Sequence, residues 1–284
     1  MQRNRSEGWR FAKIDGHANE ARFAEELLAN PDLIDEIEGL LDNSLPEGDP
    51  TVVADGNKKV PSIFDDLTIS KTDIEIKWDG GEQVSISVKK STGGQVWLAT
   101  LPRFVASVER EIGTLDAGLV KGLSLYIGGA NLAGFEDEFD KAVAADASFF
   151  VPKMIAQEKR HKRLVAESMA RSFPSEWKKV LEFFNEHIGL ITRLSFAQGF
   201  AVNEEDFADV VIYNQVTGDR NIFPIGELIA AAEKDVLTRP VVAGTRYNGS
   251  TLVLPFGSLQ MHRPKGVNQF QFRHEYREVS RLFS

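Results

Sequence analysis

The segment SKTDIEIKWDGGEQVSISVKKSTGGQ, residues 70–95, decides the fold. Apolar and polar residues alternate over positions 73–78 and again over positions 84–90, which is typical of strands with one buried face. Between these runs, residues 79–82 read DGGE, and glycine supplies the positive φ angles that a tight turn needs. The segment therefore predicts a β-hairpin.

The side chains of the two predicted strands separate by parity, because successive residues of a strand point to opposite faces. The apolar faces contain Ile74, Ile76 and Trp78 on one strand and Val84, Ile86 and Val88 on the other. When these faces coincide, Asp73, Ser87 and Lys89 lie together on the opposite face, at the open end of the hairpin. A carboxylate beside an ammonium group can hold a divalent cation and orient a water molecule.

This arrangement resembles the core hairpin of the PD-(D/E)XK nucleases, the superfamily of many restriction enzymes and Holliday-junction resolvases. In that family an Asp opens one strand, an acidic-x-Lys triplet lies on the next, and a preceding helix often adds a Glu. Residues 71–73 (KTD) match the first element and residues 87–89 (SVK) match the second, within a resemblance over roughly residues 10–112. Thr72 stands where the family often has Pro. Ser87 stands where it usually has Asp or Glu, although some members carry Ser and recruit a carboxylate from elsewhere.

The resemblance implies an α/β (α+β) fold with a restriction-endonuclease-like mixed central sheet flanked by helices, a helical insertion and a β-rich C-terminal part. It implies a Mg²⁺-dependent DNA endonuclease, such as a type II restriction enzyme, in which Asp73 and a recruited acid bind the metal. Lys89 would orient and help deprotonate the attacking water, and Ser87 would hydrogen-bond a metal-bound water. Gln95 would sit by the scissile phosphate or act as a plain polar strand residue. Because Ser87 cannot replace the charge of a carboxylate, an inactive DNA-binding or assembly protein on this fold is the alternative.

Glu20 is the preferred source of the missing carboxylate. It precedes a helical pattern of apolar residues, and the family's first helix delivers a Glu toward the metal. A carboxylate in the first turn of a helix is also favoured by the helix dipole, which gives Glu20 a purely structural explanation. Other acids remain open, namely Glu25, Glu26, Glu109 and Glu111, and Asp65 and Asp66 compete with Asp73 as the first acid.

The sequence patterns along the chain predict three consecutive regions. Residues 1–130 form a nuclease-like core with the catalytic hairpin at 72–90, residues 131–200 are mainly helical, and residues 201–284 are strand-rich and packed on the same core. Helices are predicted at 31–41, 102–112 and 224–236, a loop at 44–59, a strand or a buried turn at 123–127, and strands at 207–213, 240–243, 251–255 and 268–272.

Two further segments are predicted to contact DNA. Residues 90–95 form a polar, glycine-rich turn from which Lys90 and Ser91 could approach a phosphate. The C-terminal tail interleaves basic and aromatic residues, which suits a surface that follows a phosphate backbone. Because Gln and Arg can read base edges, the predicted DNA-binding residues here are Arg263, Lys265, Gln269, Gln271 and Arg273. The structural alternative is an amphipathic terminal strand and helix that close the core.

Composition further restricts the metal sites, the mode of nucleic-acid binding and the location that we expect for the protein. The absence of cysteine excludes disulfides and thiolate metal sites, so a metal would need oxygen or histidine ligands. The net charge of −9 argues against coating nucleic acid through bulk charge but allows one basic cleft. No apolar run is long enough to span a membrane, and the first residues lack a secretion signal, so a cytoplasmic location is expected. Restriction enzymes that read symmetric sites tend to be two-fold dimers, so a homodimer is expected too.

Overall fold

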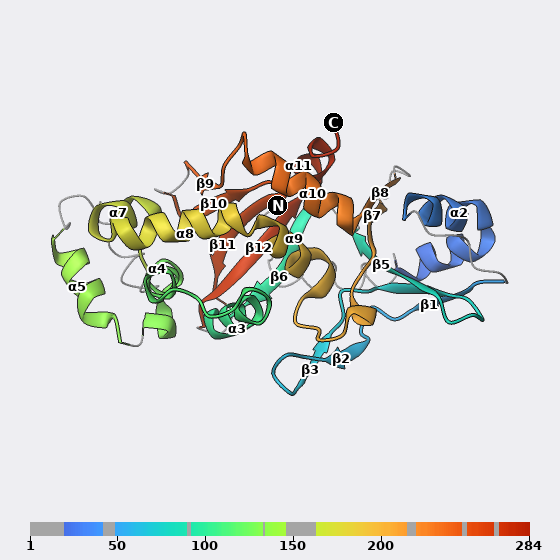
Figure 1. Ribbon diagram of the computed structural model, residues 1–284, viewed down its shortest axis with the longest axis horizontal. Coiled ribbons are helices and arrows are strands. Elements are labelled where there is room, and N and C mark those ends of the chain that lie inside the picture. The colour runs from blue at the N-terminus through green and yellow to red at the C-terminus, as the bar shows by residue number, and fades with distance from the viewer. Residues whose placement is uncertain are drawn as a thin grey trace, which may run out of the picture. The chain divides into compact units, whose positions relative to one another are not determined.

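The computed structural model describes residues 20–41, 49–89, 92–132, 134–145, 163–214, 220–245, 249–263 and 267–284. The chain divides into two compact units, which are drawn in Figure 1. The first contains Met1–Thr92 and Thr192–Ala230, and the second contains Gly93–Ile191 and Ala231–Ser284. This interleaved division differs from the three consecutive regions expected from the sequence, because each unit combines two separate stretches of the chain.

The first unit is built on a five-stranded mixed sheet in the order β1-β4-β5-β7-β8. Its strands are β1 (Thr51–Ala54), β4 (Ile74–Lys77), β5 (Gln83–Lys89), β7 (Val210–Asn214) and β8 (Arg220–Pro224). Strands β4 and β5 form the predicted hairpin, with Ile74 opposite Ile86. Strands β5 and β7 are parallel, and a parallel pair needs a long crossover connection. Because this crossover contains residues 93–191 of the second unit, the two units are interleaved along the chain.

Helices cover the apolar face of this sheet. The helix of residues 20–29 and α2 (Pro31–Leu40) contribute Phe23, Leu27 and Ile37 to one buried cluster with Ile74 and Ile86 of the hairpin. Pro31 begins α2, at a position where a helix does not use the backbone N–H. The predicted helix at 31–41 is therefore confirmed, and the polar residues of the hairpin are left on the other face.

A small hairpin adds to the first unit. It consists of β2 (Lys59–Pro61) and β3 (Leu67–Ile69), which pair in an antiparallel register. Of the loop predicted at 44–59, residues 44–48 lie outside the described residues, and the prediction is wrong at β1, which pairs with β4 along four residues. The Gly, Pro and Asp residues that suggested a loop flank this short edge strand.

The second unit contains an antiparallel sheet in the order β6-β12-β11-β10-β9. These strands are β6 (Gly93–Ala99), β9 (Val242–Ala243), β10 (Thr251–Leu254), β11 (Gly257–His262) and β12 (Gln269–Glu275). One face is aromatic, since the Trp97 and Phe272 rings stack at 5.0 Å and Phe104 of α3 (Leu101–Ile112) packs against both. The sheet core is thus formed by residues far apart in sequence.

The remaining helices are α4 (Ala117–Ile127), α5 (Glu136–Ala145), α7 (Ala166–Ser172), α8 (Pro174–Glu186), α9 (Ile188–Arg193), α10 (Ile225–Val236) and α11 (Tyr276–Arg281). Short turns of other helix types are η1 (Gly129–Leu132), η2 (Leu194–Gln198) and η3 (Glu204–Asp206). The strand or buried turn predicted at 123–127 is wrong, because these residues end α4. The Asp116 carboxylate caps α4 by accepting the N–H groups of Gly118 and Leu119.

The predicted α/β class is confirmed, since both units combine a sheet with helices. The predicted helices at 102–112 and 224–236 and the strands near 207–213, 240–243, 251–255 and 268–272 are also found, with ends shifted by up to a few residues. Among the residues that the structure describes, no helix is both long and apolar enough to cross a membrane.

Candidate active site

Asp73 directly precedes β4, and its carboxylate reaches across to β5. Its Oδ2 accepts the Val88 backbone N–H at 2.7 Å and lies 3.5 Å from the Ser87 hydroxyl. The Lys89 Nζ lies 3.8 Å from the same oxygen and also donates a hydrogen bond to the Ser87 hydroxyl. The structure therefore brings together the three residues that strand parity grouped, and the Asp73 and Lys89 side chains each remain 17% exposed.

Hydroxyl groups hold the segment that precedes Asp73. The Thr72 N–H donates to Ser70 Oγ at 3.0 Å, and Ser70 Oγ donates to the Asp206 carbonyl at 3.1 Å. Thr72 stands where the family that the sequence resembles often has Pro, a residue without an N–H. Here the additional N–H is satisfied locally by Ser70, and both hydroxyl side chains are buried. The start of β4, and with it Asp73, is therefore held in place without Pro.

The surroundings of Asp73 disfavour its charged form. Burial raises the pKa of Asp73 above its ordinary value, although Lys89, the Val88 N–H and Lys71 act in the opposite direction. Carboxylates whose surroundings disfavour the charged form are common at functional sites.

Lys71 is a second amine at this site, which the sequence analysis did not single out. Burial, with a smaller contribution from Lys89 and against an opposing effect of Asp73, lowers the pKa of Lys71 to about 7. Its aliphatic stem packs on Gly199, where a Cβ atom would lie 3.1 Å from Lys71 Cε. The signal was present in residues 71–73, since extending the strand alternation backwards places Lys71 on the same side as Asp73.

Glu20, the preferred second acid, is the first described residue of the helix of residues 20–29. Its carboxylate occupies the space that a side chain on Gly56 would need. Gly56 follows Asp55, whose N–H donates to the Asp73 carbonyl at 3.0 Å. Glu20 therefore lies near the same end of the β1–β4 pair as Asp73. Its helix covers the apolar face of the sheet, so Glu20 lies beside the ends of these strands.

A comparison with solved structures found a similar chain. The crystal structure of the restriction endonuclease MspI in complex with its cognate DNA matches 86% of this chain and 77% of the MspI chain. The TM-score is 0.44 and the sequence identity is 12%. No protein-family model and no curated protein sequence matches the chain.

The other acids that the sequence left open have different surroundings. Glu26 forms an ion pair with Arg220, whose guanidinium lies over the Phe23 ring. Glu109 accepts the Leu115 N–H at 3.0 Å and belongs, like Glu111, to α3 of the second unit. The remaining acids lie in the turn between β2 and β3 or on an exposed helix face: Asp65, Asp66 and Glu25.

The tail residues predicted to contact DNA lie on β12, in the second unit. Gln269, Gln271 and Arg273 alternate along this strand and therefore share one face, opposite Phe270 and Phe272. The predicted strand is thus confirmed, while the DNA contact stays a prediction. Arg263 is exposed just after β11, and Lys90, Ser91 and Lys265 lie outside the described residues.

Gln95, predicted beside the scissile phosphate, belongs to β6 of the second unit. Its Oε1 accepts a hydrogen bond from Gln271 Nε2 at 3.4 Å, and Gln271 Oε1 accepts one from Gln260 Nε2 at 2.8 Å. Three neighbouring strands therefore carry a row of hydrogen-bonded glutamines, which sequence spacing alone could not reveal. The catalytic role of Gln95 stays a prediction, and its observed partners associate it with the predicted base-reading residues.

The oxygen donors at Asp73 fit the preferences of Mg²⁺. Within the described residues, both hydrogen bonds to the Asp73 carboxylate reach Oδ2, which leaves Oδ1 for a ligand. Carboxylate and hydroxyl oxygens are hard ligands of the kind that Mg²⁺ binds. Asp73 and Glu20 would hold the ion. In the described part of the chain no group of three or more Asp, Glu or His side chains is arranged around one point.

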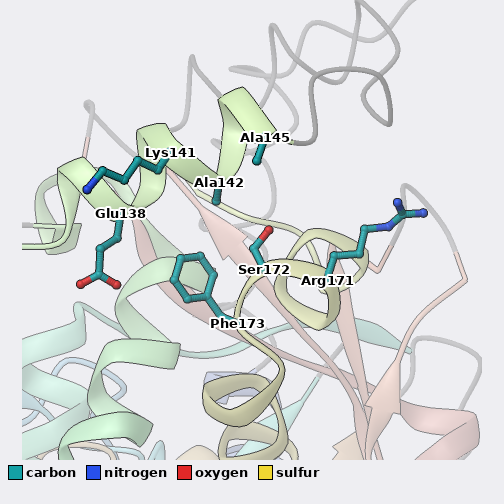
Figure 2. A pocket seen from close by; sticks show the side chains of 7 residues that line it. All are labelled: Glu138, Lys141, Ala142, Ala145, Arg171, Ser172 and Phe173. Atoms are coloured by element: carbon teal, nitrogen blue, oxygen red, sulfur yellow. The ribbon is translucent and has the colours of Figure 1, made fainter.

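Two cavities lie away from Asp73 and Lys89. One of about 510 Å³ lies in the second unit, where Figure 2 shows Ala142 and Ala145 of α5 facing Ser172 and Phe173 at the end of α7. None of the predicted site residues lines it. Another, of about 440 Å³, opens beside the hairpin turn, and its acidic lining would repel a phosphate: Glu204, Glu205, Asp206 and Asp209.

Proposed function

We propose that this protein is a Mg²⁺-dependent endonuclease that hydrolyses phosphodiester bonds in DNA, in the manner of a type II restriction enzyme. The observation that carries the proposal is the meeting of the Asp73 carboxylate and the Lys89 ammonium, 3.8 Å apart, on the polar face of the hairpin. Both side chains remain partly exposed, so a phosphate and a water molecule can reach them.

The roles follow from the contacts of each side chain. Lys89 orients the attacking water and, after losing a proton to solvent, would take as a neutral amine the proton that the water loses, while the Ser87 hydroxyl accepts a hydrogen bond from the Lys89 amine and fixes its direction. Asp73, held through Oδ2 by Val88, would bind the cation, and Glu20 would supply the second negative charge. When bound, Mg²⁺ would offset the negative charge that builds on the phosphate during attack.

DNA recognition is assigned to the polar face of β12. The side chains of Gln269, Gln271 and Arg273 are of the types that read base edges in the major groove, and Arg263 would contact the backbone. Gln95 joins this surface through its hydrogen bond to Gln271. The proposal includes a cytoplasmic homodimer, because a symmetric recognition site is read most simply by a two-fold assembly.

A DNA-binding protein without cleavage activity is the second candidate function. It is favoured by one observation, the presence of the fully buried Ser87 where the family usually has an acid. Loss of that carboxylate removes a charge that would otherwise hold the metal, while leaving a hairpin that still folds.

Supercoiled plasmid separates the two functions. Purified protein is incubated with plasmid in Mg²⁺ or in EDTA, beside Asp73→Ala, Lys89→Ala and the control Lys59→Ala, whose side chain is exposed on β2. We expect nicking or linearisation by the wild type in Mg²⁺ alone, a loss of about 100-fold or more in the two site variants, and no change in the control. Equal cleavage by all four proteins would refute the site, and DNA binding without cleavage would support the second function.

A further inference from the structure

We infer that Lys71 is a second phosphate-binding residue of this site and that Gly199 positions its amine. The inference rests on the proposed function, because it concerns the same phosphodiester that Lys89 and Asp73 would act on.

The charges of the site point to an anionic ligand. Asp73 interacts electrostatically with both Lys71 and Lys89, so that two amines lie near one carboxylate. Ser87 provides no second negative charge on β5. Repulsion by the Lys89 ammonium disfavours the charged form of Lys71, and a bound phosphate would offset this repulsion while forming charge-assisted hydrogen bonds with both amines. The charges of these side chains are therefore better balanced when a phosphodiester is bound than when the site is empty.

The backbone at Gly199 explains where the Lys71 side chain runs. Gly199 has φ of +59° and follows the π-helical turn η2, whose last bond joins the Gly199 N–H to the Leu194 carbonyl at 2.9 Å. Such turns occur frequently at functional sites. A Cβ at this position would lie 3.1 Å from Lys71 Cε and 3.5 Å from Cγ. The Lys71 stem thus follows the bare backbone of Gly199, and a side chain there would displace the amine.

Salt-dependent DNA binding tests the assignment without relying on cleavage. A short duplex is titrated with wild type, Lys71→Met, Lys71→Arg and the control Lys77→Met in buffer with EDTA, at several salt concentrations. Each phosphate contact contributes about one to the slope of log K against log salt concentration. We expect Lys71→Met to bind more weakly with a slope smaller by about one, and Lys77→Met and Lys71→Arg to keep the wild-type slope.

A second variant tests the positioning by Gly199. In Gly199→Ala the amine is present but displaced, so we expect slower cleavage in Mg²⁺ together with weaker DNA binding. Thermal unfolding of each variant establishes that it is folded. Because Lys71→Arg keeps the charge, a normal slope with reduced cleavage in this variant would also support a positioned phosphate contact.

The outcomes distinguish the inference from the proposed function. If the wild type cleaves DNA and Lys71→Met matches it in slope and rate, the inference about Lys71 is wrong and the proposed function stands. If the wild type neither binds nor cleaves DNA under any condition, both are wrong. If Lys71→Met loses one unit of slope while Lys77→Met does not, the inference is supported.

Discussion

The Asp73 carboxylate and the Val88 backbone N–H are joined by a hydrogen bond of 2.7 Å that connects the start of β4 to the end of β5. The Asp73 N–H also donates to the Ile86 carbonyl at 2.8 Å. Asp73 is therefore held by the main chain of β5 through both its backbone and its side chain. A ligand meets a carboxylate whose direction is already set, which lowers the entropy lost when the ligand binds.

Substitution of Asp73 by Asn should stabilise the fold while it abolishes cleavage. Burial raises the pKa of Asp73, so this group contributes most stability below the pKa of an unfolded Asp, and that contribution is lost as the pH rises through the folded pKa. At neutral pH the uncharged Asn should thus give a higher midpoint of thermal unfolding. It should also lower the cleavage rate by about 100-fold or more. A variant less stable than wild type at neutral pH would contradict the electrostatic account.

Glu75→Gln should have the opposite effect on stability. Burial alone would raise the pKa of Glu75, but hydrogen bonds from Lys58 and Lys77, each of 2.7 Å, hold the pKa below its ordinary value. The stabilisation by Glu75 is therefore present above the unfolded pKa and is lost as the pH falls through the folded pKa. Urea denaturation at pH 7 should show a less stable variant, and the difference should shrink in acid. A constant difference across this range would argue against the ion pairs.

Ser87→Asp should restore a second acid on β5. The Ser87 hydroxyl lies 3.5 Å from Asp73 Oδ2, so an added carboxylate would adjoin the proposed metal ligand. Since affinity for hard cations rises with ligand charge, the Mg²⁺ concentration for half-maximal cleavage should fall by on the order of tenfold. Ser85→Asp is the matched control, because Ser85 is equally buried on the same face of β5. Unchanged metal dependence in a folded Ser87→Asp variant would count against Asp73 as a metal ligand.

Gln271 and Arg273 should affect DNA binding in different ways. Gln271→Ala should relax the sequence preference by about 1–3 kcal/mol at one base pair, because an amide that reads a base edge is lost. Arg273→Ala should weaken binding to all sequences and reduce the salt slope by about one if it contacts a phosphate. Competition between duplexes of different sequence measures both effects. Normal affinity and preference in both variants would remove β12 from the proposed DNA interface.

Phe104→Ala should destabilise the second unit severely. The Phe104 ring contacts the aromatic rings of Trp97, Phe184, Phe270 and Phe272 and is fully buried. Removal of a buried phenylalanine ring typically costs about 3–5 kcal/mol. Phe283→Ala, at a ring that is 39% exposed, should change the stability by about 0.5 kcal/mol. Comparable losses in the two variants would mean that Phe104 does not anchor this core.

The hairpin could be predicted from the sequence because its pattern is local. Alternation, a DGGE turn and parity are sufficient to place Asp73, Ser87 and Lys89 on one face, and the register of β4 with β5 bears this out. The approach of Lys71 to Gly199 could not be predicted in the same way. It depends on a contact across more than a hundred residues and on the backbone angle at one glycine.

The helix at residues 123–127 and the division into units could not be predicted either. Residues 123–127 alternate poorly and are buried on all sides, so strand and helix are equally compatible with their composition. The parallel pairing of β5 with β7 depends on two apolar runs that have no sequence signal linking them. Gln95 was predicted either beside the scissile phosphate or as a plain polar strand residue, and the chain passes into the second unit at Gly93, just before it.

The parallel pairing of β5 with β7 also determines when the first sheet can be completed during synthesis. During translation, about 120 residues must follow Lys89 before β7 emerges, which takes roughly 6–24 s at about 5–20 residues per second. Until then one edge of β5 has no permanent neighbour on the nascent chain. A ribosome that stalls within this interval would release a fragment in which the first sheet cannot be completed.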